Sequence, residues 1–455
     1  MISFIIKNKK KIDYLAYAIF LFFSFVNLFF INISFYIYLI FIIVSFLFLK
    51  EILNFDNSFG IIFFFILILL GFWFKFTIIS IFFNSNFGEG IGFFDFTKNS
   101  MNEVILVSAI FKLAILSAHF IFLKKKFKFK EIKLFYIQKF CSTNYTFLVF
   151  IIPFFVIASC YFNFVNEIFL RSHPINENFL FLLNYFKFFY KIFAPFLIYF
   201  LIDLSLKSNF SLKKIFFIFI YLTLVLNIIY SSQLSREVGL HIIIFLYSFI
   251  FIYKKSGNQI QNKYFNILLS SFLICFIINL YIVQYARLSG ISLIDDITIE
   301  QKILNNNISL IFNRWVGVDA VMAVASNIEK SWKLFYEIAN NQISWTNKVA
   351  WPFTNYFVNK VHVNTPGPAA FLYSTGSYIF LFSVTFMIFI LFLFLCHLIR
   401  LLGNNFIFSS NFLMYALAFR FIHMGLGIYN LIYFILSIFF LIIAVVTINL
   451  YLKIK

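Results

Sequence analysis

The stretch GIIFFFILILLGFWFKFTIISIF, residues 60–82, carries a single charged side chain, that of Lys75. A helix that crosses the hydrocarbon core of a bilayer needs about 20 predominantly apolar residues, because its length must match the thickness of that core. The stretch has this length and this composition. It therefore predicts a transmembrane helix over residues 60–82.

Similar runs recur from one end of the chain to the other. Of the 455 residues, 63% are hydrophobic and 12% are charged, whereas a soluble globular protein is about 25% charged. We therefore predict an all-α polytopic membrane protein with about twelve transmembrane helices. The predicted spans cover residues 13–31, 33–49, 60–82, 102–123, 145–163, 180–203, 214–231, 239–253, 265–283, 371–397, 407–424 and 428–451.

The basic residues predict how these helices are oriented. Lysine and arginine are enriched in the loops on the cytoplasmic side of a membrane. The clusters KNKKK (7–11), KKKFKFKEIK (124–133) and KKSGNQIQNK (254–263) fall on one side when the spans alternate in direction. Both termini are then cytoplasmic. These loops also account for the net charge of +19, so we expect no nucleic-acid partner.

One connection, residues 284–370, is much longer than the others and falls on the outside. Its runs 308–326 and 331–339 have the periodicity of amphipathic helices. The chain is therefore divided into spans one to nine (1–283), a large outside loop (284–370), and spans ten to twelve (371–455).

The sequence lacks the motifs of nucleotide-driven pumps and of zinc proteases. It contains no P-loop, no GxGxxG and no HExxH, and its four cysteines show neither a CxxC pair nor the spacing of metal ligands. We therefore expect neither a metal nor a cofactor.

Several basic side chains lie inside the predicted spans. Because a charge is costly in lipid, each of them is a candidate functional residue. The members of this group are Lys75, Lys112, Lys187, Lys191 and Arg420. Lys187 and Lys191 are four residues apart and share one helical face, where like charges repel unless an anion lies beside them. The alternatives are that these side chains reach back to the interface or pair with a buried acid.

Three arginines follow or flank spans on the outer side, namely Arg236, Arg287 and Arg314. Arginine binds phosphate oxygens with a planar, permanently charged fork. Arginines that converge above a cationic cavity would suit a lipid-linked diphosphate. For Arg287 alone, an anchor to lipid headgroups is the alternative.

Few residues on the outer side can act as a base. Glu237 and His241 are four residues apart and share a face if that stretch is helical, and His362 lies just before span ten. Any of them could take a proton from an attacking sugar hydroxyl, or be a satisfied polar residue. Asp319 is better explained as a satisfied residue of a solvated loop. The TPGP segment at 365–368 predicts a non-helical entry into span ten, with irregular backbone lining a cavity.

Taken together, these features resemble the O-antigen polymerase family (Wzy-type oligosaccharide repeat-unit polymerases). The resemblance covers most of the chain as architecture: about twelve spans with a large outside loop late in the chain. As motif it covers S-R-x-x-G-L at Ser235 to Leu240 and T-P-G-x-x-x-F-L-Y-x-x-G at Thr365 to Gly376. A repeated R-x10-G pattern found in some members is absent, because Tyr247, Thr298 and Ala325 stand at the glycine positions after the three outer arginines.

The resemblance implies metal-independent glycosyl transfer at the periplasmic face of a bacterial inner membrane. A glycan on undecaprenyl diphosphate would be passed to an incoming lipid-linked repeat unit, which builds O-antigen (the polymer of lipopolysaccharide) or capsular polysaccharide. Membrane lipids and a chain-length regulator protein would be its partners. The residues expected to hold the diphosphate are Arg236, Arg287, Arg314, Lys187, Lys191 and Arg420, and those expected to activate the acceptor hydroxyl are His362, Glu237 or His241.

Three other functions remain as alternatives. A polyprenyl-phosphate-sugar-dependent glycosyltransferase would carry acidic residues in its first outside loop, which here is the short uncharged segment 32–34. A lipid-linked oligosaccharide flippase explains the spans and the lysines, but it does not need the long loop. A membrane O-acyltransferase needs a histidine deep in a span, and His119 is the only fair candidate.

Overall fold

The helices are known from a computed structural model. It describes residues 8–454 except 31–32, 55–56, 82–93, 95–96, 125–133, 170–176, 207–211, 234, 236, 257–269, 271–272, 284, 286–315, 328, 341–348, 350–366, 402–405 and 425–427.

The described residues form helices and no strand, so the all-α prediction is confirmed. Eight of these helices are long and apolar enough to cross a membrane. They are α2 (Lys9–Phe30), α3 (Phe35–Ile52), the continuous helix of α4 (Phe59–Ile68), η1 (Leu69–Phe74) and α5 (Lys75–Ile81), α6 (Lys98–Lys124), α8 (Tyr145–Val165), the continuous helix of α9 (Leu183–Phe188), η3 (Phe189–Phe193) and α10 (Ala194–Ser205), α20 (Tyr378–Arg400) and α22 (Ile428–Ile454).

Four shorter apolar helices complete the set of predicted spans. They lie in α11 (Leu212–Ser231), in α12 (Val238–Ser256), over Leu273–Val283 and in α21 (Ile407–Ile422). Each predicted span overlaps one of the long or short helices, while the total of twelve crossings stays a prediction. An additional helix, α7 (Phe135–Thr143), packs against α22.

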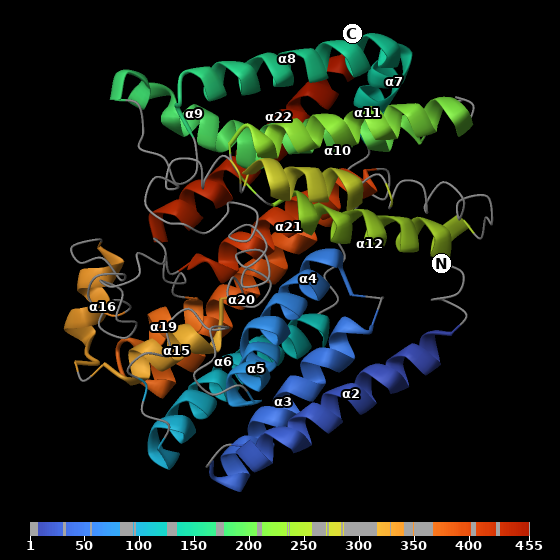
Figure 1. Cartoon of the computed structure of the whole chain (residues 1–455). Helices are drawn as coiled ribbons and strands as arrows, with labels where there is room; N and C mark the ends of the chain where they lie inside the picture. Colours follow the sequence, from blue (N-terminus) through green and yellow to red (C-terminus); the bar gives the residue numbers. More distant parts are fainter. Residues whose placement is uncertain are drawn as a thin grey trace.

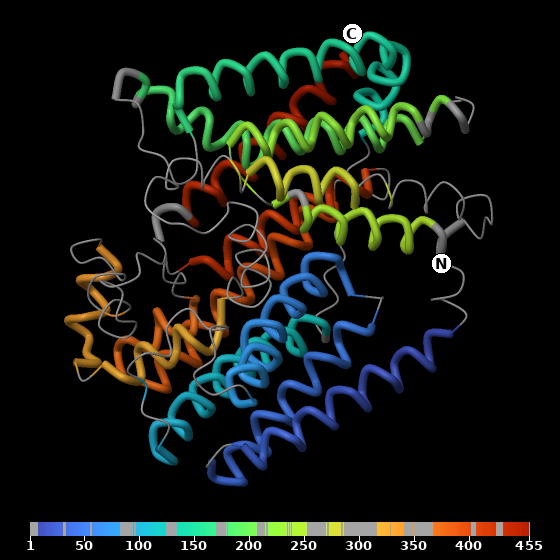
Figure 2. The backbone as a smooth tube through the Cα atoms, in the orientation of Figure 1, coloured from blue at the N-terminus to red at the C-terminus, as the bar shows by residue number. Residues whose placement is uncertain are grey.

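The helices form two groups joined by the C-terminal part of the chain. Figures 1 and 2 show α2 to α6 on one side and α7 to α11 on the other, with the red helices of the last third between them. Helix α20 packs along α6, while α21 contacts both α4 and α10. These two helices therefore connect the halves of the bundle.

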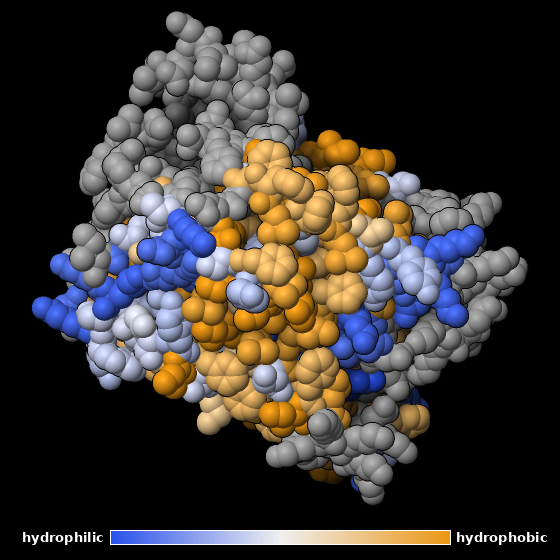
Figure 3. Space-filling view, turned by 90° about the horizontal axis from the view of Figure 1, so that it is seen from below, coloured by the Kyte–Doolittle hydropathy of each residue, from blue (hydrophilic) through white to orange (hydrophobic). Residues whose placement is uncertain are grey.

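The surface has the apolar band expected of a protein in lipid. Helices α2 and α3 expose large hydrophobic side chains such as Phe22, Phe29 and Tyr36. Figure 3 shows a broad hydrophobic band across one face, with hydrophilic residues on both sides of it. Because only a bilayer core favours such a band on the outside of a protein, the chain is a membrane protein.

The second half of the long loop and its C-terminal end contribute two segments that are buried among the spans. Helix α15 (Val318–Ala325) buries all its residues but the last, and it packs against α6 and α19 (Pro368–Tyr373), which is itself entirely buried. The amphipathic helix predicted over 308–326 is therefore wrong in the part that the structure describes. Its small apolar side chains fit between neighbouring helices, and its one charge is paired within the protein.

Two other predictions near the loop have different outcomes. Helix α16 (Trp332–Ala339) buries Leu334 and Ile338 and exposes Trp332 and Tyr336, which confirms an amphipathic helix there. Span ten was predicted to begin at residue 371, but α20 begins at Tyr378. The helix is interrupted between α19 and α20. In this turn Gly376 has a φ of 76°, in the left-handed region that favours glycine.

The loop end and the third span are in backbone contact through two glycines. A side-chain carbon on Gly71 would lie 2.0 Å from the carbonyl oxygen of Val316, and one on Gly317 would lie 1.8 Å from the carbonyl oxygen of Gly71. Neither distance is compatible with a Cβ atom. Glycine at both positions is therefore what lets the loop end insert against η1.

We expect Gly71→Ala to lower the free energy of unfolding by about 1–3 kcal/mol, because the added methyl group meets backbone atoms that cannot rotate away. The measurement is thermal unfolding in detergent, followed by tryptophan fluorescence. Gly60→Ala is the matched control, since its Cβ would meet the side chains of Cys396 and Met414, which can shift. Equal losses in the two variants would contradict the close backbone contact.

Candidate functional site

The stretch 230–241 is a break between two helices. Helix α11 ends at Ser231 and α12 begins at Val238, so Glu237 lies at the N-terminal end of α12. The amide of Leu240 donates to the carbonyl oxygen of Glu237 at 3.0 Å. The break lies before Glu237, which directly precedes the turn of α12 that carries His241, and Glu237 is half-buried at the junction.

His241 lies in a cage of aromatic rings and is 1% exposed. Its Nδ1 is 2.7 Å from the hydroxyl of Tyr199. The rings of Tyr230 and Tyr415 approach the imidazole with centroid distances of 4.7 and 5.2 Å. Its Nε2 has no hydrogen-bond partner among the described residues. A buried nitrogen without a partner calls for an explanation, and a ligand hydroxyl is one.

Three more buried side chains around this junction have polar atoms without a partner in the described part of the chain. They are the hydroxyl of Tyr190, Oε1 of Gln233 and Oδ1 of Asn279. Asn279 donates to the hydroxyl of Ser231 at 2.8 Å, which fixes its amide beside the end of α11. Together with His241, these groups form what we name the junction cluster: Tyr190, Gln233, His241 and Asn279.

Two of the predicted cations, Lys187 and Lys191, lie close along the chain to Tyr190 of the junction cluster. Lys191 follows Tyr190 in η3, and its Nζ is 5.5 Å from the centre of the Phe169 ring. Lys187 lies one turn earlier on α9 and is half-buried. Since η3 is π-helical, the α-helical spacing used to place the two lysines on one face does not hold throughout this segment.

Arg420 reaches the same region from α21. Its guanidinium carbon is 5.4 Å from the centre of the Phe434 ring on α22, and α21 contacts η3. The ring of Tyr433, beside Phe434, carries a hydroxyl 3.5 Å from the carbonyl oxygen of Asn184 on α9. The elements that carry Lys187, Lys191 and Arg420 therefore contact one another.

Helix α21 connects these cations to the C-terminal end of the long loop. Tyr415 on α21 contacts His241, and a side-chain carbon on Gly367 would lie 3.8 Å from the carbonyl oxygen of Ile422 and 2.4 Å from Val316. Seven residues separate Tyr415 from Ile422, which is about 10 Å of helix. The aromatic cage, Arg420 and the loop residue Gly367 thus lie along two turns of one helix.

Four of the predicted site residues, Arg236, Arg287, Arg314 and His362, lie outside the described residues. Arg236 is the chain neighbour of Ser235 and Glu237, which both belong to the junction. Sequence reasoning missed Tyr190, Gln233 and Asn279 because uncharged side chains are common in membrane helices. The only signal that could have identified them is that several polar side chains surround the break between α11 and α12.

The lysines of the other half of the bundle have different partners. Lys75 Nζ is 2.7 Å from Asp319 Oδ2, with both side chains buried, so pairing with a buried acid is confirmed for Lys75. The interpretation of Asp319 as a solvated loop residue is wrong, because the loop end folds into the bundle. Lys112 is also buried, where its ammonium contacts the hydroxyl of Ser45 and lies 3.4 Å from the centre of the Phe41 ring.

Two π-helical segments occur at predicted functional lysines. Segment η1 directly precedes Lys75, and η3 contains Lys191. A π-helical turn widens the helix locally and frees backbone groups from the regular ladder, and such turns are frequent at functional sites.

The described residues contain no group of three or more histidine, cysteine, aspartate or glutamate side chains that could hold a metal ion. Comparison of the chain with protein-family models, with curated proteins and with solved structures finds no match.

Proposed function

We propose that this protein polymerises oligosaccharide repeat units carried on undecaprenyl diphosphate, at the outer face of a bacterial inner membrane. The observation that carries the proposal is the position of the junction cluster beside Lys191, with α21 connecting it to Arg420 and to Gly367 of the long loop. In this arrangement the cations can bind an anion, and the polar groups of the junction cluster can bind a ligand with many hydroxyl groups.

The cations supply the anion-binding part. A lipid diphosphate carries its charge at the level of the outer half of the spans, where Lys187, Lys191 and Arg420 are predicted to lie. Fixed positive groups stabilise the charge that builds on the diphosphate as the glycosidic bond breaks. Arg236, Arg287 and Arg314 are proposed to act with them.

The junction cluster supplies the part that recognises the sugar. Gln233 and Asn279 each offer a carbonyl oxygen that can accept from a sugar hydroxyl, and Tyr190 can donate or accept. The Nε2 of His241, which has no partner among the described residues, can accept the proton of an attacking hydroxyl while Nδ1 is held by Tyr199. Glu237 and His362 remain proposed alternatives for this role.

A lipid-linked oligosaccharide flippase is the second candidate. It is favoured by the buried ionisable groups of the other half of the bundle, Lys75, Asp319 and Lys112. Ionisable residues inside the membrane mark transport pathways in many proteins. A flippase, however, gives no specific role to a loop that inserts buried segments among the spans.

Deletion of the gene separates the two functions. Without the polymerase, cells display a single repeat unit on the surface lipid and no ladder of longer chains on a polysaccharide gel. Without the flippase, repeat units stay on the inner leaflet and the surface carries none. A normal ladder in the deletion strain would overturn both proposals.

We expect Lys191→Met to reduce the polymerisation rate on the order of 100-fold, because it removes a fixed positive group from the developing charge. The measurement is ladder length at matched protein level in a deletion strain that expresses each variant. Lys214→Met is the control, a lysine near the opposite end of neighbouring α11. Full-length ladders with Lys191→Met would remove Lys191 from the site.

A further inference from the structure

A row of polar side chains runs along the interface of α3 and α6, far from the junction cluster. Near one end, the amide of Ser34 donates to Asn102 Oδ1 at 2.8 Å. In the middle, the Lys112 ammonium contacts Ser45. At the other end, His119 Nε2 is 3.2 Å from Glu51 Oε2. Lys112 and His119 are both 0% exposed, and such buried ionisable groups in a membrane protein require a reason.

The Glu51 end of this row is connected to a cavity. Asn57 Nδ2 donates to Glu51 Oε2 at 2.9 Å, and the hydroxyl of Tyr247 donates to the carbonyl oxygen of Asn57 at 2.8 Å. Asn57 and Tyr247 also line a cavity of about 50 Å³. Because one water needs about 10–15 Å³, the cavity has room for about three to five waters.

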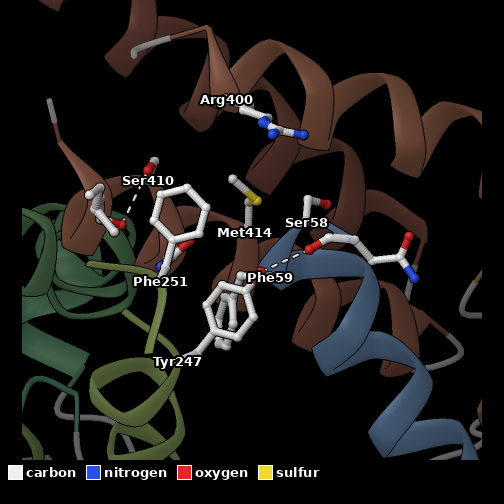
Figure 4. Close-up of a pocket in the computed structure, with 10 residues that line it drawn as sticks. Ser58, Phe59, Tyr247, Phe251, Arg400, Ser410 and Met414 are labelled. Carbon is white, nitrogen blue, oxygen red and sulfur yellow. Dashed lines mark hydrogen bonds between the residues drawn. The ribbon is translucent and has the colours of Figure 1, made fainter. Parts of the chain in front are cut away.

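The cavity has a polar wall and an exposed basic residue at its edge. Figure 4 shows Ser58, Ser410 and Arg400 around it, with the rings of Tyr247 and Phe251 on one side. The Ser58 hydroxyl has no partner among the described residues. By the predicted orientation, this end of the bundle faces the cytoplasm. Water in the cavity would therefore be in contact with the cytoplasmic side.

His119 has one nitrogen on Glu51 and one that is unused. Its Nδ1 is buried without a hydrogen-bond partner in the part of the chain that the structure describes. On α6 it lies two turns from Lys112, on the same helical face, which is about 10 Å along the axis. A histidine with one nitrogen on a carboxylate and the other directed elsewhere can take a proton on one side and release it on the other.

A proton is a better ligand for this pair than a metal ion. The Asn57 amide donates both to Glu51 Oε2 and, at 3.0 Å, to the Glu51 carbonyl oxygen. These bonds hold the carboxylate in place beside His119. Among the described residues no third histidine, cysteine, aspartate or glutamate joins the pair to complete a metal site.

We propose that the Glu51–His119 pair is the cytoplasmic entry of a proton pathway through the half of the bundle formed by α2 to α6. Water in the cavity protonates the Glu51 carboxylate. Glu51 passes the proton to His119 Nε2, and the imidazolium releases its Nδ1 proton towards the amine of Lys112. One proton moves at each step, and Lys112 accepts it as a neutral amine. Glu51 returns to the carboxylate, whereas His119 is left with its proton on Nε2 and is reset for the next proton when the ring turns over and exchanges its two nitrogens.

The pathway continues towards the outer half through the next ionisable pair. The ring of Phe41, over which the Lys112 ammonium lies, is 5.5 Å from the ring of Phe76. Phe76 is the neighbour of Lys75, which is paired with Asp319 on α15. Three stations, Glu51–His119, Lys112 and Lys75–Asp319, are therefore distributed through one half of the bundle.

The other charged groups near the entry pair lie on the helices around it. They are Lys50 on α3, His397 and Arg400 near the end of α20, and the titratable but neutral Tyr247 on α12. Helix α4 contributes an apolar side chain, Phe65, whose ring centre is 5.2 Å from that of the His119 imidazole. Among these described groups there is no second carboxylate that could compete with Glu51 for a proton from the cavity.

Proton flux into liposomes tests this pathway without any glycan, so its outcome is independent of the proposed polymerase function. The full-length protein is reconstituted, a potassium diffusion potential is imposed, and uptake is followed with a pH-sensitive dye. We expect uptake well above that of protein-free liposomes. Glu51→Gln and His119→Gln should each lower the protein-dependent rate about 100-fold, the usual contribution of a positioned proton-transfer group.

Asn102→Ala is the matched control, because it changes the same helix interface at its uncharged end, and it should retain the flux of the wild type. Glu51→Gln keeps an acceptor for Asn57, so the variant should elute as a monodisperse peak like the wild type. Wild-type flux equal to that of protein-free liposomes would overturn the proposal even if no variant folds. Undiminished flux in folded Glu51→Gln or His119→Gln would overturn it as well.

Discussion

We expect the Lys75→Met variant to be about 3–5 kcal/mol less stable than the wild type, because it leaves a carboxylate buried without its counter-charge. The side chains of Lys75 and Asp319 are 2% and 3% exposed, and their atoms are 2.7 Å apart. Asp319 lies on α15, so the pair also holds the loop end against the third span. The midpoint of unfolding by a denaturing detergent measures the loss.

Two further variants distinguish a buried pair from a general sensitivity to lysine loss. The double variant Lys75→Met/Asp319→Leu should regain most of the stability, since an apolar replacement of both partners is often nearly neutral. Lys330→Met breaks the contact with Glu103, where the two side chains are 22% and 25% exposed, and should cost about 1 kcal/mol or less. A similar loss for Lys330→Met and Lys75→Met would argue against the buried pair.

The second large effect is expected at the start of α21. Asp203 on α10 accepts hydrogen bonds from the amides of Phe408 and Ser409 at 3.0 and 2.9 Å, and from the Ser409 hydroxyl at 2.7 Å. These amides belong to the first turn of the helix, which has no internal acceptors for them and carries partial positive charge. A buried carboxylate from a neighbouring helix thus caps α21.

We expect Asp203→Ala to lower the free energy of unfolding by about 2–4 kcal/mol, because it removes a helix cap and leaves buried donors without an acceptor. Asp203→Asn keeps one acceptor oxygen and should lose clearly less. Thermal unfolding in detergent gives both values. Because α21 also carries Tyr415 and Arg420, Asp203→Ala should further reduce the polymer made by cells. An Asp203→Ala protein as stable as the wild type would show that α21 does not depend on this cap.

The candidate site was predictable from the sequence only in part. Charge identified Lys187, Lys191 and Arg420, and the structure places them on elements that contact one another. For Lys75 the sequence left several interpretations open, because its partner Asp319 is 244 positions away along the chain. His241 was expected at the outer surface as a base, whereas the structure places it inside an aromatic cage, because α10, α11 and α21 pack their rings against it.

The sequence by itself determined the helices of this protein. In lipid every backbone polar group must be satisfied within its own segment, so a run of about 20 apolar residues has no alternative to a helix. The tertiary structure decided which segment of the long loop is buried among the spans. The segment at 318–325 has the composition of a short helix on a surface or in a core, and only the glycine contact with η1 and the charge of Lys75 select burial. Local sequence fixes hydrogen bonding along one helix, whereas the partner of a buried charge depends on which distant segments pack together.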